Sequence, residues 1–560
     1  MTLSASSTQP LFLGIDLSTQ QLKAIAVDAD LTVTHEFAIP FDAHFAAEFK
    51  IKDGVQVSAT EADVVTVPTL MWVAALDALL ASMRSQAFPF HRVKCISGTG
   101  QQHGSVYWAK GAESTLAGLE SSSNRELRDI LSQSFAVQDS PIWMDSSTAA
   151  ECAVLEQAVG GPEKLAAISG SRAYERFTGA QIAKLQRTKP DQMAACERIS
   201  LVSSFVASLL IGGYAPIDES DGSGMNLLNL QTRNWEARLL QATQVSDLSV
   251  KLGAPVPSDT LVGTISRYFV SRYGFAEDCV VGAFTGDNPA SLAGMRIGEG
   301  DMTVSLGTSD TLFLWLKDTQ SLQQERTTLD GHVFCNPVDT QSYMALLCYK
   351  NGSLARERVR DRALHLNSEQ TQTQKWAAFD AALASTPVGN NGIVAAYFDQ
   401  TEITPSARGE LRLGADGNEV AALSPEQEIR SLIEGQFLAK RLHAERLGYN
   451  TSSARRILAT GGASNNGAIL QILANVFGAR VYRLEQANSA ALGCAFRAVH
   501  SWRKHGSLHD ARSFEQATAQ AEPPKLVAVP DPAATAVYNQ LLQAYANVES
   551  LLVARTKRDA

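Results

Sequence analysis

The sequence is short of basic charge, of paired cysteines and of long apolar runs. Its 58 acidic residues outnumber its 48 lysines and arginines, which leaves a formal net charge of −10. Nucleic-acid-binding proteins usually carry a basic excess or stripe, so this balance argues against a nucleic acid partner. No stretch approaches the roughly 20 uninterrupted apolar residues of a membrane-spanning helix. We therefore expect neither nucleic acid nor a membrane as a partner.

The seven cysteines are scattered, and no two of them have C-x-x-C spacing. An odd number without close pairs argues against a disulfide framework and against a structural zinc site. The first residues, MTLSASSTQP, also lack the basic and apolar regions of a signal peptide. The simplest expectation is a reducing compartment, the cytoplasm.

The chain has 560 residues, of which 45% are hydrophobic, so we expect two or more domains, each with its own core. Residues 11–28 place two apolar runs on either side of a small polar turn, which predicts a β-hairpin. From Pro68 onward, apolar residues recur at helical spacing, and residues 198–212 predict an apolar helix. Strands that alternate with helices predict an α/β fold.

Residues 301–316 repeat the hairpin pattern of residues 11–28, although the letters differ. The repetition predicts two halves built on one plan. We place their boundary near residue 285, which gives domains 1–285 and 286–560.

Three further segments carry weaker patterns. Residues 110–140 are rich in Ser, Glu and Gly and predict a surface excursion. Residues 505–530 predict a loop or a partly ordered segment, and the stretch from Pro532 predicts a final amphipathic helix.

Both hairpin turns have the composition of a phosphate site, because small residues let backbone N–H groups converge on an anion. In the first turn Asp16 is a candidate Mg²⁺ ligand, acting through water, and Lys23 is a candidate cationic arm. The second turn, residues 307–310, carries Gly, Thr, Ser and Asp. Neither is a Walker A loop, since the sequence has no G-x-x-x-x-G-K-[ST]. On local evidence alone a plain hairpin is the favoured interpretation of each turn, and two such hairpins in one chain are more informative than either.

A third glycine site lies in residues 456–478, where Gly461 and Gly462 join a strand pattern to a helix with Ser464 or Asn465 near its start. Missing side chains would let an adenosine approach the backbone, and Asn465 is a candidate hydrogen-bond partner for it. A tight β–α turn that needs glycine for its conformation is the alternative.

Asp287 and Asn288 follow an apolar strand, and Pro289 marks the first turn of a helix. A carboxylate at the C-terminal end of a strand is well placed to orient an attacking hydroxyl and to accept its proton. An ordinary Asp, with a pKa near ~4, suffices for that role. The alternative is that Asp287 is a helix N-cap.

Three more side chains have both a functional and a structural interpretation. His103 follows a glycine turn, where a neutral imidazole can hydrogen-bond a sugar hydroxyl or can be purely structural. Arg176 can bind a substrate oxygen or pair with a surface carboxylate. Trp376 can cover an adenine or pack in the core.

Taken together and in order, these motifs resemble the FGGY family of carbohydrate kinases, and within it the xylulose kinases of the eukaryotic type. The resemblance runs from residue 14 to about 495 and is weakest in residues 110–140 and 500–560. The segments that carry it are GIDLSTQQLKAIAVD, SGTGQQHGSVYW, PIWMDSSTAAEC, GSRAYERFTGAQIAKL, DESDGSGMNLLN, GDNPASLAGM, SLGTSDTLF, CYKNGSLARE and LATGGASNNGAILQILANVFG.

The resemblance implies two actin-like (ribonuclease-H-like) domains around a deep cleft, with sugar mainly on the first and ATP with Mg²⁺ mainly on the second. It implies phosphorylation of a terminal hydroxyl, here O5 of D-xylulose, in pentose catabolism. Asp287 matches the catalytic base and also contacts sugar, as do Asn288, His103 and Arg176. Arg172 is close to Arg176, which we prefer because it directly precedes Phe-Thr-Gly. A monomer or homodimer is expected.

The resemblance also implies the nucleotide side. Asp16 matches the Mg²⁺-side carboxylate, acting through water. The ATP contacts that it implies are Thr19, Lys23, Gly307, Thr308, Trp376, Gly461, Gly462 and Asn465. Lys23 stands where several members carry Arg, which leaves its role less defined.

Two rival functions remain at this point. One is another sugar or polyol kinase of the same family, acting on ribulose, gluconate or glycerol; the sugar-side group Gln101, Gln102, His103 and Arg176 would discriminate it. The other is a non-catalytic actin-like ATP-binding protein, which would not need His103, Arg176 and Asp287 together.

Overall fold

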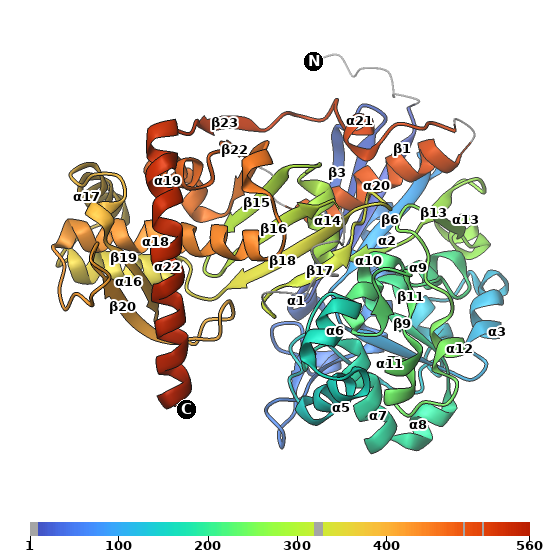
Figure 1. The fold of residues 1–560 in the computed structure, drawn as a ribbon. Helices are drawn as coiled ribbons and strands as arrows, with labels where there is room; N and C mark the ends of the chain where they lie inside the picture. The colour runs from blue at the N-terminus through green and yellow to red at the C-terminus, as the bar shows by residue number, and fades with distance from the viewer. Residues whose placement is uncertain (1–8, 318–328, 485–487, 507–508, 560) are drawn as a thin grey trace, which may run out of the picture. The chain divides into compact units, whose positions relative to one another are not determined.

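The computed structural model describes residues 9–317, 329–484, 488–506 and 509–559 (Figure 1). The chain divides into two compact units that are not consecutive segments of sequence. The first comprises Met1–Arg296, Val333–Tyr343 and Ala487–Glu522, and the second comprises Ile297–His332, Met344–Gln486 and Pro523–Ala560. Asp287 therefore belongs to the first unit. The sequence-based domains 1–285 and 286–560 stay a prediction.

The first unit is built on a sheet with the strand order β12-β13-β6-β1-β2-β3. Its strands are β1 (Leu11–Leu17), β2 (Gln21–Asp28), β3 (Val33–Pro40), β6 (Val93–Gly100), β12 (Leu261–Thr264) and β13 (Val280–Gly282). The predicted hairpin is confirmed, because β1 pairs antiparallel with β2.

One edge of this sheet collects the ends of three strands. β1 and β6 run parallel, and the short strand β14 (Thr285–Gly286) also pairs parallel with β6. Leu17 and Gly286 are both partners of Gly100. The residues just beyond these three strand ends are therefore brought to the same edge, although they are about 85 to 270 positions apart in sequence.

Helices cover the faces of this sheet. They include α2 (Thr69–Ser85), α9 (Val202–Ile211), α14 (Asp287–Gly294) and α20 (Ser489–His505). The helix predicted after Pro68 is confirmed as α2. The helix predicted over residues 198–212 begins only at Val202, because residues 196–201 form strand β9 (Cys196–Leu201), which pairs with β7 (Ser105–Ala109).

The segment 110–140 is not a surface excursion, as the sequence suggested. It contains α3 (Ala112–Ala117) and α4 (Leu127–Ile130), and its apolar side chains enter the core of the first unit. Leu116, Leu119 and Leu127 are each fully buried. Its many Ser and Glu residues lie between these buried leucines and interrupt the apolar spacing, so the sequence pattern did not predict that they are buried.

The second unit repeats the plan. β15 (Asp301–Leu306) and β16 (Asp310–Leu316) form the second predicted hairpin, and β21 (Arg456–Thr460) runs parallel to β15 on its other side. The remaining strands in the order β18-β16-β15-β21-β22-β23 are β18 (Tyr343–Tyr349), β22 (Arg480–Arg483) and β23 (Lys525–Ala528). The prediction of two halves on one plan is thus confirmed.

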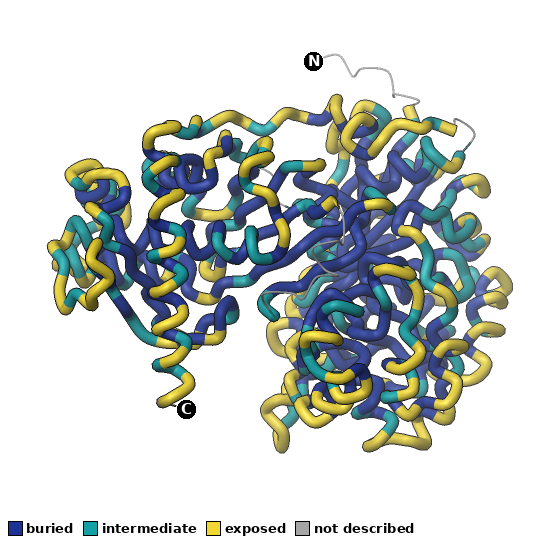
Figure 2. The backbone as a smooth tube through the Cα atoms, viewed as in Figure 1, coloured by how far each residue is buried: buried dark blue, intermediate teal, exposed yellow. Residues whose placement is uncertain are grey.

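The helices of the second unit pack against this sheet, against a two-stranded ribbon or against each other, and Figure 2 shows buried residues along them. They are α16 (Ser353–Ala363), α17 (Gln372–Ala384), α18 (Pro425–Arg446), α19 (Gly467–Phe477) and α22 (Pro532–Asp559), with a second ribbon of β19 (Val394–Phe398) and β20 (Gly409–Leu413). Helix α18 starts with a capping box, in which Ser424 and Gln427 bond each other's backbone N–H.

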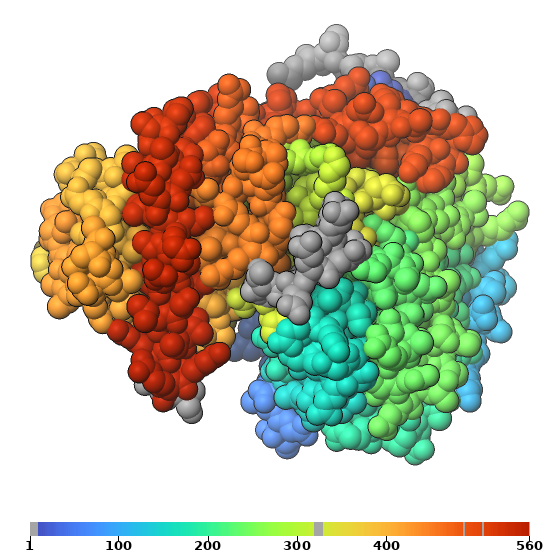
Figure 3. All heavy atoms as spheres, viewed as in Figure 1, coloured from blue at the N-terminus to red at the C-terminus, as the bar shows by residue number. Residues whose placement is uncertain are grey.

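The C-terminal segments agree in part with prediction. Helix α22 is amphipathic, since Tyr538, Tyr545 and Leu552 are buried at seven-residue spacing, and Figure 3 shows its outer face along the second unit. Within residues 505–530, where 507–508 lie outside the described residues, α21 (Phe514–Ala517) and β23 are ordered elements. Among the described residues, no helix is both long and apolar enough to cross a membrane.

Candidate functional site

Asp16 lies near the end of β1, at the edge where three strands of the first unit end. Its side chain is only 3% exposed, and Ser18 Oγ donates a hydrogen bond to its Oδ1 at 2.8 Å. Burial raises the pKa of Asp16, while the Ser18 hydrogen bond and the charge of Lys23 oppose that rise. A cation at this carboxylate would relieve the cost of its burial.

The other two residues predicted in the first turn have defined partners. Lys23, opposite Asp16 in the hairpin, donates from Nζ to Asn488 Oδ1 at 2.8 Å. Thr19 Oγ1 accepts from the indole nitrogen of Trp143 at 2.9 Å. Asn488 and Trp143 gave no functional signal in the sequence, because they are distant in the chain and meet the turn only in the fold.

Asp287 is the first residue of α14, directly after the strand β14. It is not the N-cap, since that position is Gly286. Its Oδ1 accepts from the backbone N–H of Asn288 at 2.8 Å and from the Asn288 side-chain amide at 3.2 Å. The carboxyl is half-buried.

The pKa of Asp287 is raised to about 7, first by burial and then by the negative charge of Asp16. This pKa lies above the ordinary Asp value near ~4, which would have sufficed for the role. The reason is the tertiary fold, which buries the carboxyl and brings a second carboxylate to the same sheet edge. A carboxylate that titrates near neutrality is better matched to proton transfer at physiological pH than an ordinary one.

Two glutamines lie at the same edge, directly after β6. Gln102 Oε1 accepts from Asn288 Nδ2 at 2.8 Å, which ties the turn after β6 to α14. Gln101 is 1% exposed, and neither atom of its amide has a hydrogen-bond partner among the described residues. The sequence grouped both with His103 but gave them no contact of their own.

His103 follows them in the left-handed region, with φ of 69°. Its Nδ1 lies 2.9 Å from the Gly224 carbonyl oxygen, and its ring stacks on Phe177 at 4.3 Å between centroids. Burial, and then the charge of Arg176, lower its pKa to about 3. The imidazole is therefore neutral and donates from Nδ1, so Nε2 is its acceptor.

Arg176 lies near this histidine, since its charge acts on the His103 pKa. Its guanidinium carbon lies 5.5 Å from the centre of the Tyr174 ring, and that of Arg172 lies 4.1 Å from the same ring. Arg172 also donates to the Ala173 carbonyl. Within the described ranges Arg176 has no carboxylate partner, which leaves its donors for a ligand oxygen.

The second unit holds the other predicted residues around one pocket. It has a volume of about 950 Å³ and lies against the β15–β16 turn, α16, α17 and the start of α19. The predicted residues that line it are Gly307, Thr308, Trp376, Gly462 and Asn465. Thr308 and Asn465 are exposed and Trp376 is half-buried, so this tryptophan is not a core residue.

Gly461 lies directly beside this lining and turns the chain between β21 and α19. Its φ is 82°, and a Cβ there would lie 2.6 Å from the Leu306 carbonyl oxygen, so only glycine fits. Helix α19 is capped by Asn466, not by Ser464 or Asn465, since Asn466 accepts from Ile469 N–H. Asn466 also donates to Asp380 on α17 at 2.7 Å, another contact that sequence did not predict.

The other face of Trp376 has a partner of its own. The guanidinium of Arg360 lies 4.6 Å from the ring centre, and Phe379 packs edge-on. These contacts hold the indole at the pocket wall, where it can stack on a flat ring.

The structure thus gathers the predicted residues into one group in each unit. Asp16, Thr19, Lys23, His103, Arg176, Asp287 and Asn288 belong to the first unit, and Gly307, Thr308, Trp376, Gly461, Gly462 and Asn465 to the second. No cluster of three or more His, Cys, Asp or Glu that suits a metal occurs among the described residues. Asp16 fits a Mg²⁺ ion that takes its other ligands from phosphates and water.

The N-terminal domain of the FGGY family of carbohydrate kinases matches residues 135–294, and its C-terminal domain matches residues 302–502. A mouse xylulose kinase is 51% identical over 98% of this chain and 95% of its own length. The chain belongs to the FGGY family of carbohydrate kinases. It is therefore an ATP-dependent sugar kinase by family.

Other relatives extend the comparison. Xylulose kinase 2 of Arabidopsis thaliana is 45% identical over 89% of this chain and 88% of its own length. The crystal structure of a xylulose kinase from Rhodospirillum rubrum superimposes with a TM-score of 0.76 over 98% of this chain and all of that one, at 18% identity. A gluconate kinase from Lactobacillus acidophilus reaches 0.73 at 16% identity. These structures confirm the predicted fold of actin-like, ribonuclease-H-like α/β domains.

Proposed function

We propose that this protein transfers the γ-phosphate of ATP to the O5 hydroxyl of D-xylulose, giving D-xylulose 5-phosphate. The observation that carries the proposal is the half-buried Asp287 carboxyl, whose pKa is raised to about 7, in the same unit as a neutral His103. The xylulose kinases named above, at up to 51% identity, support D-xylulose as the sugar.

The first-unit residues take defined parts in this reaction. His103 Nε2 accepts a hydrogen bond from a sugar hydroxyl, and Arg176 donates to a sugar oxygen. Asn288 keeps Asp287 oriented and contacts sugar itself. Asp287 orients the O5 hydroxyl and accepts its proton as the phosphoryl group is transferred.

The second-unit pocket takes the nucleotide. Trp376 stacks on the adenine, Gly461 and Gly462 let the adenosine approach the backbone, and Asn465 hydrogen-bonds it. Gly307 and Thr308 bind phosphate oxygens, as do Thr19 and Lys23 of the first unit. Asp16 would hold Mg²⁺ through water, and the bound ion would neutralise phosphate charge.

Compartment and assembly are part of the proposal. None of the seven cysteines, all of which lie in the described residues, forms a disulfide, and six of them are buried, which supports the reducing cytoplasm. A monomer or homodimer is proposed, and light scattering on the purified protein distinguishes the two.

A panel of acceptors tests the function. ADP release is measured with D-xylulose, D-ribulose, D-gluconate and glycerol at equal concentration, with and without Mg²⁺. We expect the highest kcat/KM with D-xylulose and no turnover without Mg²⁺. A higher kcat/KM with another acceptor would reassign the substrate within the family. ATP hydrolysis that no sugar stimulates would support an actin-like ATP-binding protein without sugar kinase activity instead.

A further inference from the structure

The backbone carbonyl of Gly307 is held from the inner side of the β15–β16 turn. The N–H of Ser353, at the start of α16, donates to it at 2.8 Å, and Arg356 Nη2 donates at 3.3 Å. In a trans peptide unit the C=O and the N–H of the next residue point in opposite directions. The direction of the Gly307 carbonyl therefore sets that of the Thr308 N–H.

The Thr308 N–H therefore points away from these contacts, and Thr308 itself is exposed and lines the pocket. Within the described ranges no backbone or side-chain acceptor bonds it. The turn also sits tightly against α16, because a Cβ on Gly352 would lie 2.6 Å from the Thr308 carbonyl oxygen. The turn therefore presents the Thr308 N–H as a fixed, unpaired donor.

Asp310, the first residue after the turn, holds the Arg356 side chain in position. The two side chains are fully buried and form a bidentate pair, with N–O distances of 2.9 and 3.0 Å. Lys440 of α18 adds a third charge, with Nζ 3.0 Å from Asp310 Oδ2. Burial raises the pKa of Asp310, but Lys440 and then Arg356 outweigh it and hold the pKa below its usual value.

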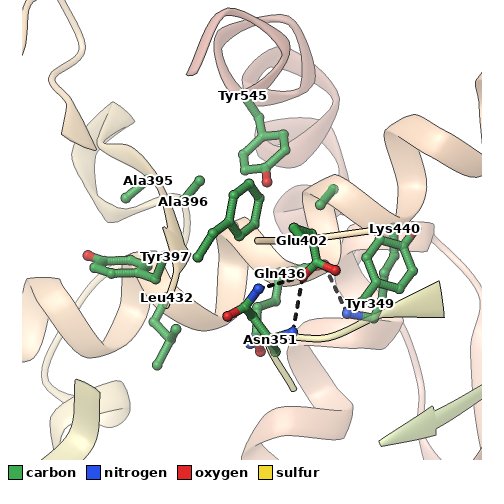
Figure 4. Close-up of a pocket in the computed structure, with 13 residues that line it drawn as sticks. Tyr349, Asn351, Ala395, Ala396, Tyr397, Glu402, Leu432, Gln436, Lys440 and Tyr545 are labelled. Carbon is green, nitrogen blue, oxygen red and sulfur yellow. Dashed lines mark hydrogen bonds between the residues drawn. The ribbon is translucent and has the colours of Figure 1, made fainter. Parts of the chain in front are cut away.

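Further polar groups contact this trio, and Figure 4 shows three of them, Asn351, Glu402 and Gln436, in the same pocket wall as Lys440. Gln436 accepts from Arg356 at 3.0 Å and donates to the Asn351 carbonyl at 2.8 Å. Glu402 accepts from the backbone N–H groups of Lys350 and Asn351 and supplies a second carboxylate near Lys440. The buried charges therefore balance, two cations against two carboxylates.

A buried ion cluster by itself contributes little to the free energy of unfolding, because apolar side chains of similar volume often stabilise a fold more. Such a cluster can, however, hold one arrangement in preference to others. Here its members come from β16, α16 and α18 and converge on a single turn.

We propose that Arg356, locked by Asp310 and Lys440, is a positioning residue that aims the Thr308 N–H at a phosphate oxygen of the nucleotide. The inference deepens the proposed kinase function and rests on it. Arg356, Asp310 and Lys440 act through the turn, not by touching the nucleotide.

The donor itself is tested by a pair of exposed substitutions. Thr308→Pro removes the N–H, whereas Thr308→Ala removes only the hydroxyl. A hydrogen bond to a charged group contributes roughly 1.5–3 kcal/mol, so Thr308→Pro raises the KM for ATP about 10- to 150-fold. Thr308→Ala changes it several-fold less, and neither changes the KM for D-xylulose. Equal ATP KM values for the two variants would overturn the role of the N–H.

The positioning device is tested by Lys440→Met and Arg356→Lys, with Arg430→Met as the control. Arg430 is buried in the same helix and pairs with Glu434, but does not contact the turn. We expect the first two to raise the KM for ATP about tenfold while the KM for D-xylulose stays unchanged, and the control to leave both unchanged. Folded variants with wild-type ATP KM would overturn the proposal. The Thr308 pair tests the proposal independently of whether these variants fold, since equal ATP KM values for that pair would also overturn it.

Measurements on the wild-type protein distinguish a failure of the proposed kinase function from a failure of the positioning proposal. If it phosphorylates no sugar, the proposed function fails, and ATP binding by calorimetry still compares Thr308→Pro with Thr308→Ala. If it is active and the variants bind ATP like wild type, only the positioning proposal fails.

Discussion

The side-chain amide of Asn288 donates to Gln102 Oε1 at 2.8 Å, which joins the start of α14 to the turn after β6. Asn288 also donates twice to Asp287, through its backbone and its side chain. The orientation of the proposed base therefore depends on a residue 185 positions earlier in the chain.

Replacing Gln102 by Met keeps the volume of the side chain but removes the acceptor. We expect kcat to fall about fivefold, because one buried hydrogen bond contributes about 1 kcal/mol and its loss frees Asn288 to rotate. The KM for ATP should not change. Steady-state kinetics with each substrate varied in turn measure both. Gln102→Glu restores an acceptor and should recover part of kcat; a Met variant with full kcat would contradict the link.

Asp287→Asn removes the proposed base while keeping the shape of the side chain. General-base catalysis contributes roughly 10²- to 10⁴-fold, so kcat should fall by that factor with a smaller change in the KM for D-xylulose. Asp77→Asn is the matched control, because Asp77 also has a raised pKa, about 6, and caps α4 far from the chemistry. It should lower the Tm without lowering kcat. Near-normal kcat in Asp287→Asn would refute the base.

The pH dependence of activity should follow Asp287. As a base it must be ionised, so log(kcat/KM) should fall with unit slope below about pH 7. His103 should add no second slope to this pH profile, because its pKa is lowered to about 3 and the imidazole stays neutral. A flat profile from pH 5 to 8 would contradict this assignment.

The raised pKa of Asp287 also affects the stability of the protein. Stability should fall as pH rises, whereas activity should rise. A carboxyl whose pKa is raised by folding holds its proton more tightly when folded, so its ionisation costs stability as pH rises from 3.8 to about 7. Asp287→Asn abolishes that cost. Its Tm relative to wild type should increase across this pH window and level off above it, as calorimetry at pH 4 to 8 would measure. A Tm difference independent of pH would show that the carboxyl is not perturbed.

Arg176 and Arg172 are distinguished by parallel substitutions to Met. Both lie over Tyr174, but Arg172 already donates to a backbone carbonyl, whereas Arg176 keeps its donors for a ligand. We expect Arg176→Met to raise the KM for D-xylulose at least tenfold, since a charge-assisted hydrogen bond contributes roughly 1.5–3 kcal/mol. Arg172→Met should have a smaller effect. The reverse order of the two KM values would move the sugar contact to Arg172.

Sequence patterns predicted the elements that depend on local chemistry. The hairpin turn between Leu17 and Gln21, the helix from Thr69 and the turn at Gly461 each follow from spacing and from residues that suit one backbone conformation. Where polar residues interrupt the apolar spacing, as in residues 110–140, the prediction failed. The strand β9 was missed because its pairing partner, β7, lies about 90 residues earlier.

The sequence predicted the roles of the candidate residues less completely than it predicted these elements. Composition and motif order sufficed for the kinase family and for the residue types at the site. They could not supply the raised pKa of Asp287, because that depends on burial and on Asp16, 271 positions away. Nor could they supply the buried pairing of Asp310 with Arg356 and Lys440. Charges interact through space, so only the tertiary fold decides which of them meet and how strongly water screens them.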